Sequence, residues 1–331
     1  MNRRNLRPLL AALVVASVLF TVAALIARAL PISNIPGLIL AVGSPYVPLI
    51  AFVGLVVAIV GRRLLLAVLA AAVVAASVGV QVSWYYFGRP ADVGAYQDIR
   101  ILSSNLRYGE ADPAFVVNLA NQNADVITFS ELTAEAVQNL RESGIEATFP
   151  YSNLDPKPGA GGIGLWSRYP LDSRSAVRTQ PFVMTAARLQ VPGVRFEPLL
   201  ASLHVQSPVT GSDDTVAEWD TGIARAKTEL ASFAATAGPA SVIIGGDYNS
   251  TPDLRQFRDL LTNGYRDAVE QTGSGFAPTF PSDEWFPPII TIDHVLARNA
   301  TASSVQTIQV PGSDHRALLA TIRVPIDPTA S

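Results

Sequence analysis

The first 90 residues are built from long apolar stretches rather than from an alternating pattern. No charged residue occurs between Leu9 and Ala27, and two further apolar stretches cover residues 37–60 and 64–87. The last of these carries Trp84, Tyr85 and Tyr86 near its end, amphipathic rings of the kind that settle at a membrane interface. Because a helix needs about 20 apolar residues to cross the hydrocarbon core of a bilayer, the pattern predicts about three transmembrane helices in residues 1–90.

The middle stretch differs from the other two because it carries two prolines. Pro45 and Pro48 each remove a backbone hydrogen-bond donor, so we expect a kink in this helix. If the middle stretch does not cross the membrane, the domain that follows changes sides. An alternative interpretation takes residues 1–29 as a signal peptide with Ala27-Arg28-Ala29 as its cleavage site. The long apolar core and the two further apolar stretches favour membrane helices over this alternative.

Beyond residue 96, short β-rich runs alternate with helical stretches, and Gly, Pro, Asn and Asp separate them. This alternation is typical of mixed α/β domains. The predicted strands cover residues 99–105, 125–130, 162–167, 185–191, 197–205, 242–247, 289–297, 303–310 and 317–324. The predicted helices cover residues 113–122, 134–143, 215–235 and 253–261. We therefore predict a linker at 91–97, a domain at 98–325 with two facing sheets covered by helices, and a tail at 326–331.

Charge divides the chain at the same place as hydropathy. Every one of the 27 acidic residues lies at Asp92 or later, whereas seven basic residues precede it. The first 90 residues thus carry +7, and the remaining 17 basic and 27 acidic residues give the rest −10. A domain this acidic lacks the positive field that non-specific binding to nucleic acid needs. With three spans, the positive-inside rule puts the N-terminus and Arg62-Arg63 in the cytoplasm and the acidic domain outside.

Polar side chains end most of the predicted strands. They are acids, amides and imidazoles: Asn105, Glu131, His204, Asp247 with Asn249, Asp293, and Asp314 with His315. Each one alone is explained by a turn, a helix cap or a satisfied buried acid. Together they indicate one convergent site at the rim of the sheets, because several strands end in metal-binding or proton-transferring groups. The absence of cysteine excludes a zinc–thiolate centre or a cysteine nucleophile there.

Seven short motifs give this series a specific resemblance. They are LSSNLR (102–107), TFSEL (128–132), LWSRYP (165–170), ASLHV (201–205), IIGGDYN (243–249), TIDHVLA (291–297) and GSDHR (312–316). In this order they resemble the motifs of the endonuclease/exonuclease/phosphatase superfamily, over about residues 98–325. The resemblance implies a four-layer α/β sandwich that hydrolyses phosphoester bonds with Mg²⁺, or with Mn²⁺ in its place.

The resemblance also implies which residues hold the metal. Glu131 would ligate the ion with Asn105 beside it, and Asp314 would lie at the ion. The donor types agree with this assignment, because hard Mg²⁺ prefers oxygen ligands and retains several waters. Hydrolysis of a phosphate ester needs such a cation for the charge on the phosphoryl oxygens.

Five further residues would carry the catalytic roles of the family. Asp247 would orient or deprotonate the attacking water, and Asn249 would bind water or phosphate. His204 would contact the phosphate. His315, oriented by Asp293, would stabilise the charge on the phosphoryl group or act as the acid/base. An imidazole paired with a carboxylate is held in one tautomer with raised basicity, which suits this role.

The chain departs from the family pattern at Arg107, where DNA-repair members carry an acid. An arginine there makes a second metal ligand doubtful and favours direct binding of a phosphate group.

GAGGIG (159–164) precedes a strand, which is the reverse of the order in a dinucleotide site, and we interpret it as a loop beside the site. His294 follows Asp293, so on a strand it points to the other face and is interpreted as structural. The aromatic segment 273–288 is either a lip of the site, a membrane-resting loop or a loop packed on the core.

Three functions compete at this point. The first is a membrane-anchored, Mg²⁺-dependent phosphoesterase outside the cytoplasmic membrane, with a lipid-linked phosphate or pyrophosphate as substrate. The anchor followed by this domain also resembles the VanJ-type proteins of glycopeptide-resistance clusters, which favours a polyprenyl pyrophosphate. The second is an exported or membrane-bound nuclease, which requires a Lys/Arg groove around Glu131 and His315. The third is a binding module without activity, which requires lost site residues.

Overall fold

The structure is a computed structural model that describes residues 3–179, 181–210 and 214–330. The first two residues of the predicted membrane region and the last residue of the predicted tail lie outside this part of the chain. The chain divides into two compact units. The helical unit comprises Met1–Tyr85 with Pro252–Arg258, and the sandwich unit comprises Tyr86–Thr251 with Asp259–Ser331.

The helical unit contains two helices that are long and apolar enough to cross a membrane. Its helices are α1 (Arg3–Ala29), α2 (Ile35–Val42), α3 (Val47–Val60), α4 (Leu64–Tyr85) and the short α9 (Arg255–Arg258). The stretches Arg7–Ala29 and Leu64–Tyr85 meet the length and hydropathy that a span requires. The pair α2 and α3 is bent by 44° at the break around Ser44–Tyr46, so the unit has two candidate spans, or three if the bent pair is one span. The kink predicted from Pro45 and Pro48 is confirmed.

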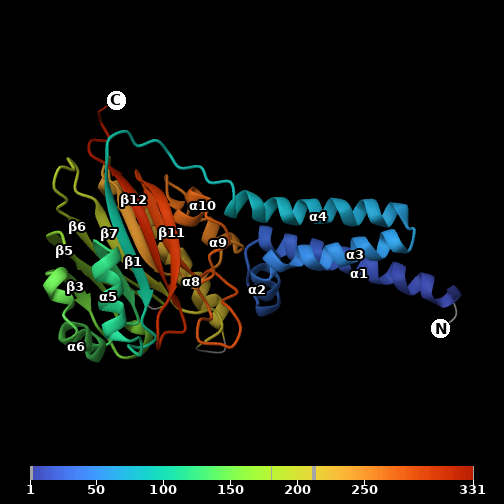
Figure 1. The fold of residues 1–331 in the computed structure, drawn as a ribbon, viewed down its shortest axis with the longest axis horizontal. Helices are drawn as coiled ribbons and strands as arrows, with labels where there is room; N and C mark the ends of the chain where they lie inside the picture. The colour runs from blue at the N-terminus through green and yellow to red at the C-terminus, as the bar shows by residue number, and fades with distance from the viewer. Residues whose placement is uncertain (1–2, 180, 211–213, 331) are drawn as a thin grey trace. The chain divides into compact units, whose positions relative to one another are not determined.

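The sandwich unit is built from two six-stranded mixed sheets (Figure 1). The first sheet has the order β11-β12-β1-β2-β4-β3 and the second has the order β5-β6-β7-β8-β10-β9. The strands of the first sheet are β1 (Tyr96–Asn105), β2 (Val126–Ser130), β3 (Tyr151–Asp155), β4 (Ile163–Ser167), β11 (Thr301–Gln309) and β12 (Arg316–Pro325). The strands of the second are β5 (Leu171–Thr179), β6 (Phe182–Leu189), β7 (Leu199–Val205), β8 (Val242–Asp247), β9 (Arg266–Asp267) and β10 (Asp293–Arg298).

Helices cover the outer faces of both sheets, which confirms the predicted four layers. The helices α5 (Pro113–Asn123), α6 (Ala134–Glu142) and α7 (Ile145–Thr148) pack into one apolar cluster with the first sheet. The long helix α8 (Thr215–Ala237) packs on β6, β7 and β8, and α10 (Ala268–Thr272) packs beside β9 to β11. The predicted starts of α5 and α8 are confirmed: Asp112 caps α5 at Pro113 through two backbone N–H groups, and α8 starts at Thr215 and ends directly before Gly238.

Alternating side chains form two separate cores around the first sheet. On β1, Ile99 and Ile101 pack against Leu200 and Ile243 of the second sheet. Leu102 points to the opposite face of β1 and packs into the cluster with the covering helices. Both faces of β1 are therefore buried, which holds its C-terminal end at Asn105 in a fixed position.

Close main-chain packing also fixes β8, the strand that carries the IIGGDYN motif. A Cβ at Gly246, in β8, would lie 1.9 Å from the carbonyl oxygen of Leu203 on the neighbouring β7. No side chain fits at that distance, so glycine is required for β8 to approach β7 this closely. The parallel pairing that follows from this approach aligns His204 of β7 with Asp247 of β8.

Candidate active site

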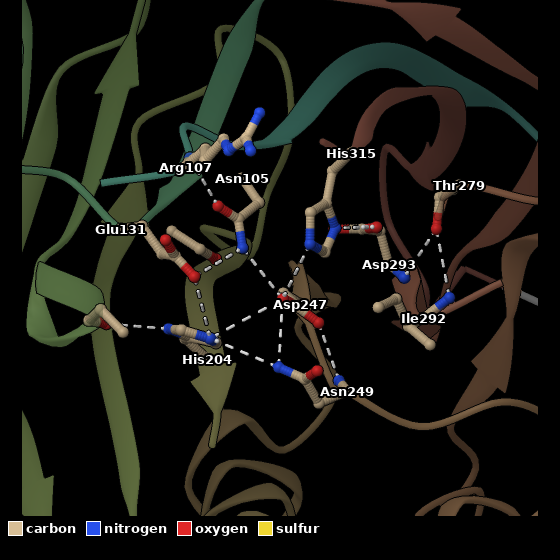
Figure 2. A network of polar contacts seen from close by, with 12 residues as sticks. Asn105, Arg107, Glu131, His204, Asp247, Asn249, Thr279, Ile292, Asp293 and His315 are labelled. Atoms are coloured by element: carbon tan, nitrogen blue, oxygen red, sulfur yellow. Dashed lines mark hydrogen bonds and ion pairs between the residues drawn. The ribbon is translucent and has the colours of Figure 1, made fainter. Parts of the chain in front are cut away.

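The strand directions bring the predicted site residues to one rim of the sandwich unit. The parallel pair β1 and β2 ends with Asn105 paired to Ser130, directly before Glu131. Strand β10 runs antiparallel to β8, and β12 runs antiparallel to β1, so both begin at this rim. Asp293 at the start of β10 is paired with Asp247, and His315 directly precedes β12. Figure 2 shows these side chains pointing toward one another.

Asp247 lies at the centre of the cluster. Its Oδ2 accepts hydrogen bonds from Asn105 Nδ2 (3.0 Å) and Asn249 Nδ2 (3.2 Å), and its Oδ1 accepts from the Asn249 backbone N–H (2.8 Å). The Nε2 atoms of His204 and His315 lie 3.7 and 3.8 Å from the same Oδ2. Burial raises the pKa of Asp247 to about 6, although both histidines oppose this shift. A carboxyl group with a pKa near neutrality is suited to accept a proton from water.

Glu131 forms the edge of the cluster nearest to β1. Its Oε1 accepts from Asn105 Nδ2 (3.2 Å) and lies 3.9 Å from His204 Nε2, and its Oε2 accepts from the Tyr108 backbone N–H (2.9 Å). The residue has a left-handed backbone with φ of +57°. Such a conformation is uncommon for a non-glycine residue and concentrates at functional sites. Here it turns the carboxylate inward directly after β2 ends.

His315 is held by Asp293 and aimed at Asp247. Its Nδ1 donates to Asp293 Oδ2 at 2.9 Å, and the ring of Phe280 packs on it with the centroids 5.0 Å apart. Burial lowers the pKa of His315, but Asp293 and Asp247 outweigh burial and raise it to about 10. The imidazole is therefore positively charged at neutral pH. Thr279 supports the pair by accepting from the Asp293 backbone N–H.

His204 has a defined tautomer because one of its nitrogens faces a carbonyl oxygen. Its Nδ1 lies 3.0 Å from the Ala160 carbonyl, which can only accept, so the proton is on Nδ1. Nε2 faces the cluster, where Asn249 Nδ2 lies 3.5 Å away. Ala160 belongs to the GAGGIG segment, which lies beside the site as predicted. Its backbone carbonyl is a contact that side-chain patterns in a sequence do not reveal.

The donor set fits a divalent cation. Glu131, Asp247 and Asp293 are buried or nearly so, and His315 supplies one positive charge against their three negative ones. Asp293 Oδ1 is buried without a hydrogen-bond partner, which is a costly arrangement for a carboxylate oxygen. Two groups of atoms lie close enough to share an ion: Glu131, His204 and Asp247, and Asp247, Asp293 and His315. In the second group His315 would have to lose its proton to act as a ligand. An ion with two positive charges would balance the net charge and take up the unsatisfied oxygen.

Two predicted ligands are placed differently from these groups. Asn105 directs its amide nitrogen at the carboxylates, and its Oδ1 accepts from the Arg107 backbone N–H (2.9 Å). Ligation of an ion by Asn105 would require the amide to turn over. Asp314 belongs to neither group among the described residues. Burial raises the pKa of Asp314 and Glu131 contributes in the same direction, whereas His315 and Arg107 oppose the shift. Both assignments stay predictions.

Arg107 lies at the rim but is already paired with acids. Its guanidinium lies 2.8 Å from Asp283 Oδ2 and 3.4 Å from Glu110 Oε2. A phosphate bound by Arg107 would therefore compete with these two carboxylates. Through Asp283, Arg107 also connects the rim to the aromatic segment 273–288, which lies beside the site because its Phe280 packs on His315.

The raised pKa of Asp247 predicts how metal binding depends on pH. A cation competes with the proton for this carboxylate, so the apparent affinity for Mg²⁺ or Mn²⁺ falls below the pKa of about 6, by up to about tenfold per pH unit. Above about pH 7 the affinity is expected to level off, because the carboxylate is already ionised. Calorimetric titrations at about pH 5 and about pH 8 test this. Equal affinities at the two values would contradict the assignment of Asp247 to the metal site.

Comparison with known proteins places this geometry in a broader context. The model of the Endonuclease/Exonuclease/phosphatase family matches residues 102–315. The comparison with curated proteins found no match.

Several solved structures share the fold of the sandwich unit. A humanised TDP2 of D. rerio with 14 mutations has a TM-score of 0.55 and 18% identity, over 68% of this chain and 98% of that chain. An endonuclease/exonuclease/phosphatase from Bacteroides vulgatus has a TM-score of 0.55 and 17% identity, over 69% and 99%. D. rerio TDP2 in complex with a single-strand DNA product has a TM-score of 0.53 and 18% identity, over 68% and 99%.

Proposed function

The chain belongs to the endonuclease/exonuclease/phosphatase family of metal-dependent hydrolases, and from this premise we propose that it is a membrane-anchored, Mg²⁺-dependent phosphoesterase. The substrate we favour is a lipid-linked phosphate or pyrophosphate. The observation that carries the proposed chemistry is the convergence of Glu131, Asp247 and His315 at one rim of the sandwich unit. It supplies an acceptor for a proton, a fixed positive charge and a set of oxygen ligands in one place.

Each residue at the rim has a task in hydrolysis. Glu131 and Asp247 would hold the ion, which when bound offsets the negative charge of the phosphoryl oxygens. Asp247 would also orient the attacking water or accept its proton, because its carboxylate lies at the centre of the cluster. The His315 imidazolium faces the same oxygen and stabilises the phosphoryl group while the bond to the leaving oxygen breaks. Asn249 and His204 hold the water and the phosphate in line.

Two features support a lipid substrate. The apolar helices α1 and α4 expose large side chains such as Leu19 and Leu64, which suit contact with lipid. An anchor of this kind would confine the site to a membrane surface, where a lipid-linked phosphate is concentrated. The arginine at the rim is also engaged, since Arg107 pairs with two acids. We also propose that the chain belongs to the VanJ-type branch of the family and that its substrate is a polyprenyl pyrophosphate.

We further propose that the sandwich unit lies outside the cytoplasmic membrane. The bent pair α2 and α3 would then form the middle of three spans. Arg62 and Arg63 lie in the connection between α3 and α4, and Arg63 Nη2 donates to the Arg7 carbonyl at 3.4 Å. The start of α1 and this connection therefore share one end of the helical unit. Basic residues at one end favour its placement in the cytoplasm.

A nuclease is the second candidate. A related fold holds a single-strand DNA product in D. rerio TDP2, so the sandwich can accommodate nucleic acid. The net charge of −10 after residue 90 and the pairing of Arg107 with two acids argue against this candidate.

The test is a substrate panel with the purified full-length chain in detergent or lipid vesicles. A polyprenyl pyrophosphate, a phosphoinositide, sphingomyelin and linear DNA would be incubated with Mg²⁺, beside Glu131→Gln as the impaired control. We expect release of phosphate from the lipid pyrophosphate and little cleavage of DNA. Cleavage of DNA and of none of the lipids would contradict the lipid substrate and favour the nuclease. Equal activity of parent and variant would contradict the site itself.

A further inference from the structure

A second histidine–aspartate pair lies directly behind the site. His294 follows Asp293 on β10, and the two side chains point to opposite faces of the strand. The His294 side chain is 0% exposed, with Nδ1 2.7 Å from Asp267 Oδ2 and Nε2 2.9 Å from the Ser250 carbonyl oxygen. The structural role predicted for His294 is thereby linked to Ser250, the residue that follows Asn249.

The hydrogen bonds of His294 define its protons. The Ser250 carbonyl can only accept, so Nε2 carries a proton and donates it to this oxygen. At 2.7 Å, Nδ1 and Asp267 Oδ2 must share a second proton, because two lone pairs would repel each other. Asp267 is itself fixed, since its Oδ1 accepts from the backbone N–H groups of Val269 and Glu270 at the start of α10. The imidazole is thus held on one side and holds the Ser250 carbonyl on the other.

The segment that His294 holds has a strained conformation. Asn249 has a left-handed backbone with φ of +45°, which few non-glycine residues adopt unless their surroundings impose it. Two further contacts act on the segment. Trp219 Nε1 donates to Ser250 Oγ (3.0 Å), and the Tyr248 N–H donates to the Ile292 carbonyl (3.0 Å). His294 alone among these three binds the Ser250 carbonyl, and so fixes the direction of the peptide that joins Ser250 to Thr251, next to Asn249.

We propose that His294 is a positioning residue for hydrolysis. Its Nε2–H fixes the Ser250 carbonyl, and this sets the Asn249 carboxamide against Asp247 Oδ2 and His204. The dipeptide Asp293-His294 consequently orients both sides of the site: Asp293 holds His315 on one face, and His294 holds Asn249 through the other. The inference rests on the proposed phosphoesterase function.

Two substitutions at His294 distinguish the contribution of Nε2 from that of Nδ1. In His294→Gln the side-chain amide reaches the place of Nε2 and can donate to Ser250, whereas in His294→Asn the amide reaches only the place of Nδ1 near Asp267. We expect both variants to lower the melting temperature. We expect kcat to stay within about threefold of the parent in His294→Gln and to fall by about tenfold to a hundredfold in His294→Asn, since small misplacements of catalytic groups have effects of this size.

Asp267→Asn is the matched control. An asparagine there can still accept from the backbone of α10 and can donate to Nδ1, which leaves the Nε2–H bond to Ser250 intact. Its kcat should therefore stay within about threefold of the parent, even where its melting temperature falls as far as that of His294→Asn. Equal losses of kcat in all three variants, compared at equal folded fraction, would show that His294 only stabilises the fold and would overturn the inference.

Hydrogen exchange provides a readout that does not depend on activity. The amides of residues 248–251 should exchange faster in His294→Asn than in His294→Gln, because only the first loses the bond to Ser250. Mn²⁺ affinity should follow the same order, since Asn249 donates to Asp247 Oδ2. If the parent hydrolyses no phosphoester, the proposed function fails, and the exchange rates still decide whether His294 fixes the Ser250 carbonyl and the segment around it. Equal exchange in the two histidine variants would overturn it.

Discussion

Replacing Glu131 by Gln is expected to lower kcat/KM by about a thousandfold or more, with a large loss of Mg²⁺ affinity. The carboxylate is 12% exposed and belongs to one of the two groups that fit an ion. Loss of one charged oxygen ligand removes most of the several kcal/mol by which a bound metal stabilises the transition state, and each ~1.4 kcal/mol is a factor of ten in rate. Steady-state kinetics over a wide range of Mg²⁺ concentration measure this effect.

The control for Glu131→Gln is a variant that removes one carboxylate far from the site. Glu142→Gln removes a carboxylate from the exposed surface of α6, where Glu142 accepts a hydrogen bond from Gln138. It should leave kcat/KM and metal affinity unchanged, because exposed charges far from a site are largely screened. An undiminished rate for Glu131→Gln at saturating Mg²⁺ would remove Glu131 from the metal site.

The second large effect is expected at His315. In His315→Asn the amide retains the place of Nδ1 beside Asp293 but lacks the Nε2 end that faces Asp247. Loss of a positioned charge or proton carrier lowers kcat by about 10² to 10⁴. We therefore expect kcat to fall in this range while KM changes little. A fall in binding alone would mean that His315 contacts the substrate without contributing to the chemical step.

Asp293→Asn tests the cause of the charge on His315. Burial alone would lower the pKa of His315, and Asp293 is the largest of the groups that raise it to about 10. The variant should therefore lose the imidazolium at a lower pH than the parent, and the alkaline limb of its pH–rate profile should move toward neutrality. An unchanged alkaline limb would show that the activity does not depend on a charged His315.

Local sequence signals predicted the elements that carry the site. The run 242–247 coincides with β8, because β-branched residues before two glycines mark both the strand and its end. Pro113 after Asp112 set the start of α5 for a similar local reason. The strands β3 and β5 were missed because both lie at sheet edges and carry polar residues without regular alternation. The predicted helix 253–261 shortens to α9, whose segment packs in the helical unit rather than on a sheet.

Tertiary contacts determined what sequence reasoning could not supply. The strand-end rule identified Asp247, Asp293 and His315, because sheet topology alone brings strand ends to one rim. It could not reveal that Asn105 presents its nitrogen to the carboxylates, since that depends on the backbone N–H of Arg107. The predicted strand 289–297 likewise begins only at Asp293, because an apolar run does not show where ladder pairing starts.

The position of the metal tests the central claim most directly. Crystals of the full-length protein soaked with Mn²⁺ would locate the ion by anomalous diffraction. The account predicts a peak about 2.1 Å from carboxylate oxygens of Glu131 and Asp247, and no peak there in Glu131→Gln. A protein that hydrolyses its substrate with Mn²⁺ while its only ordered ion touches neither carboxylate would contradict it.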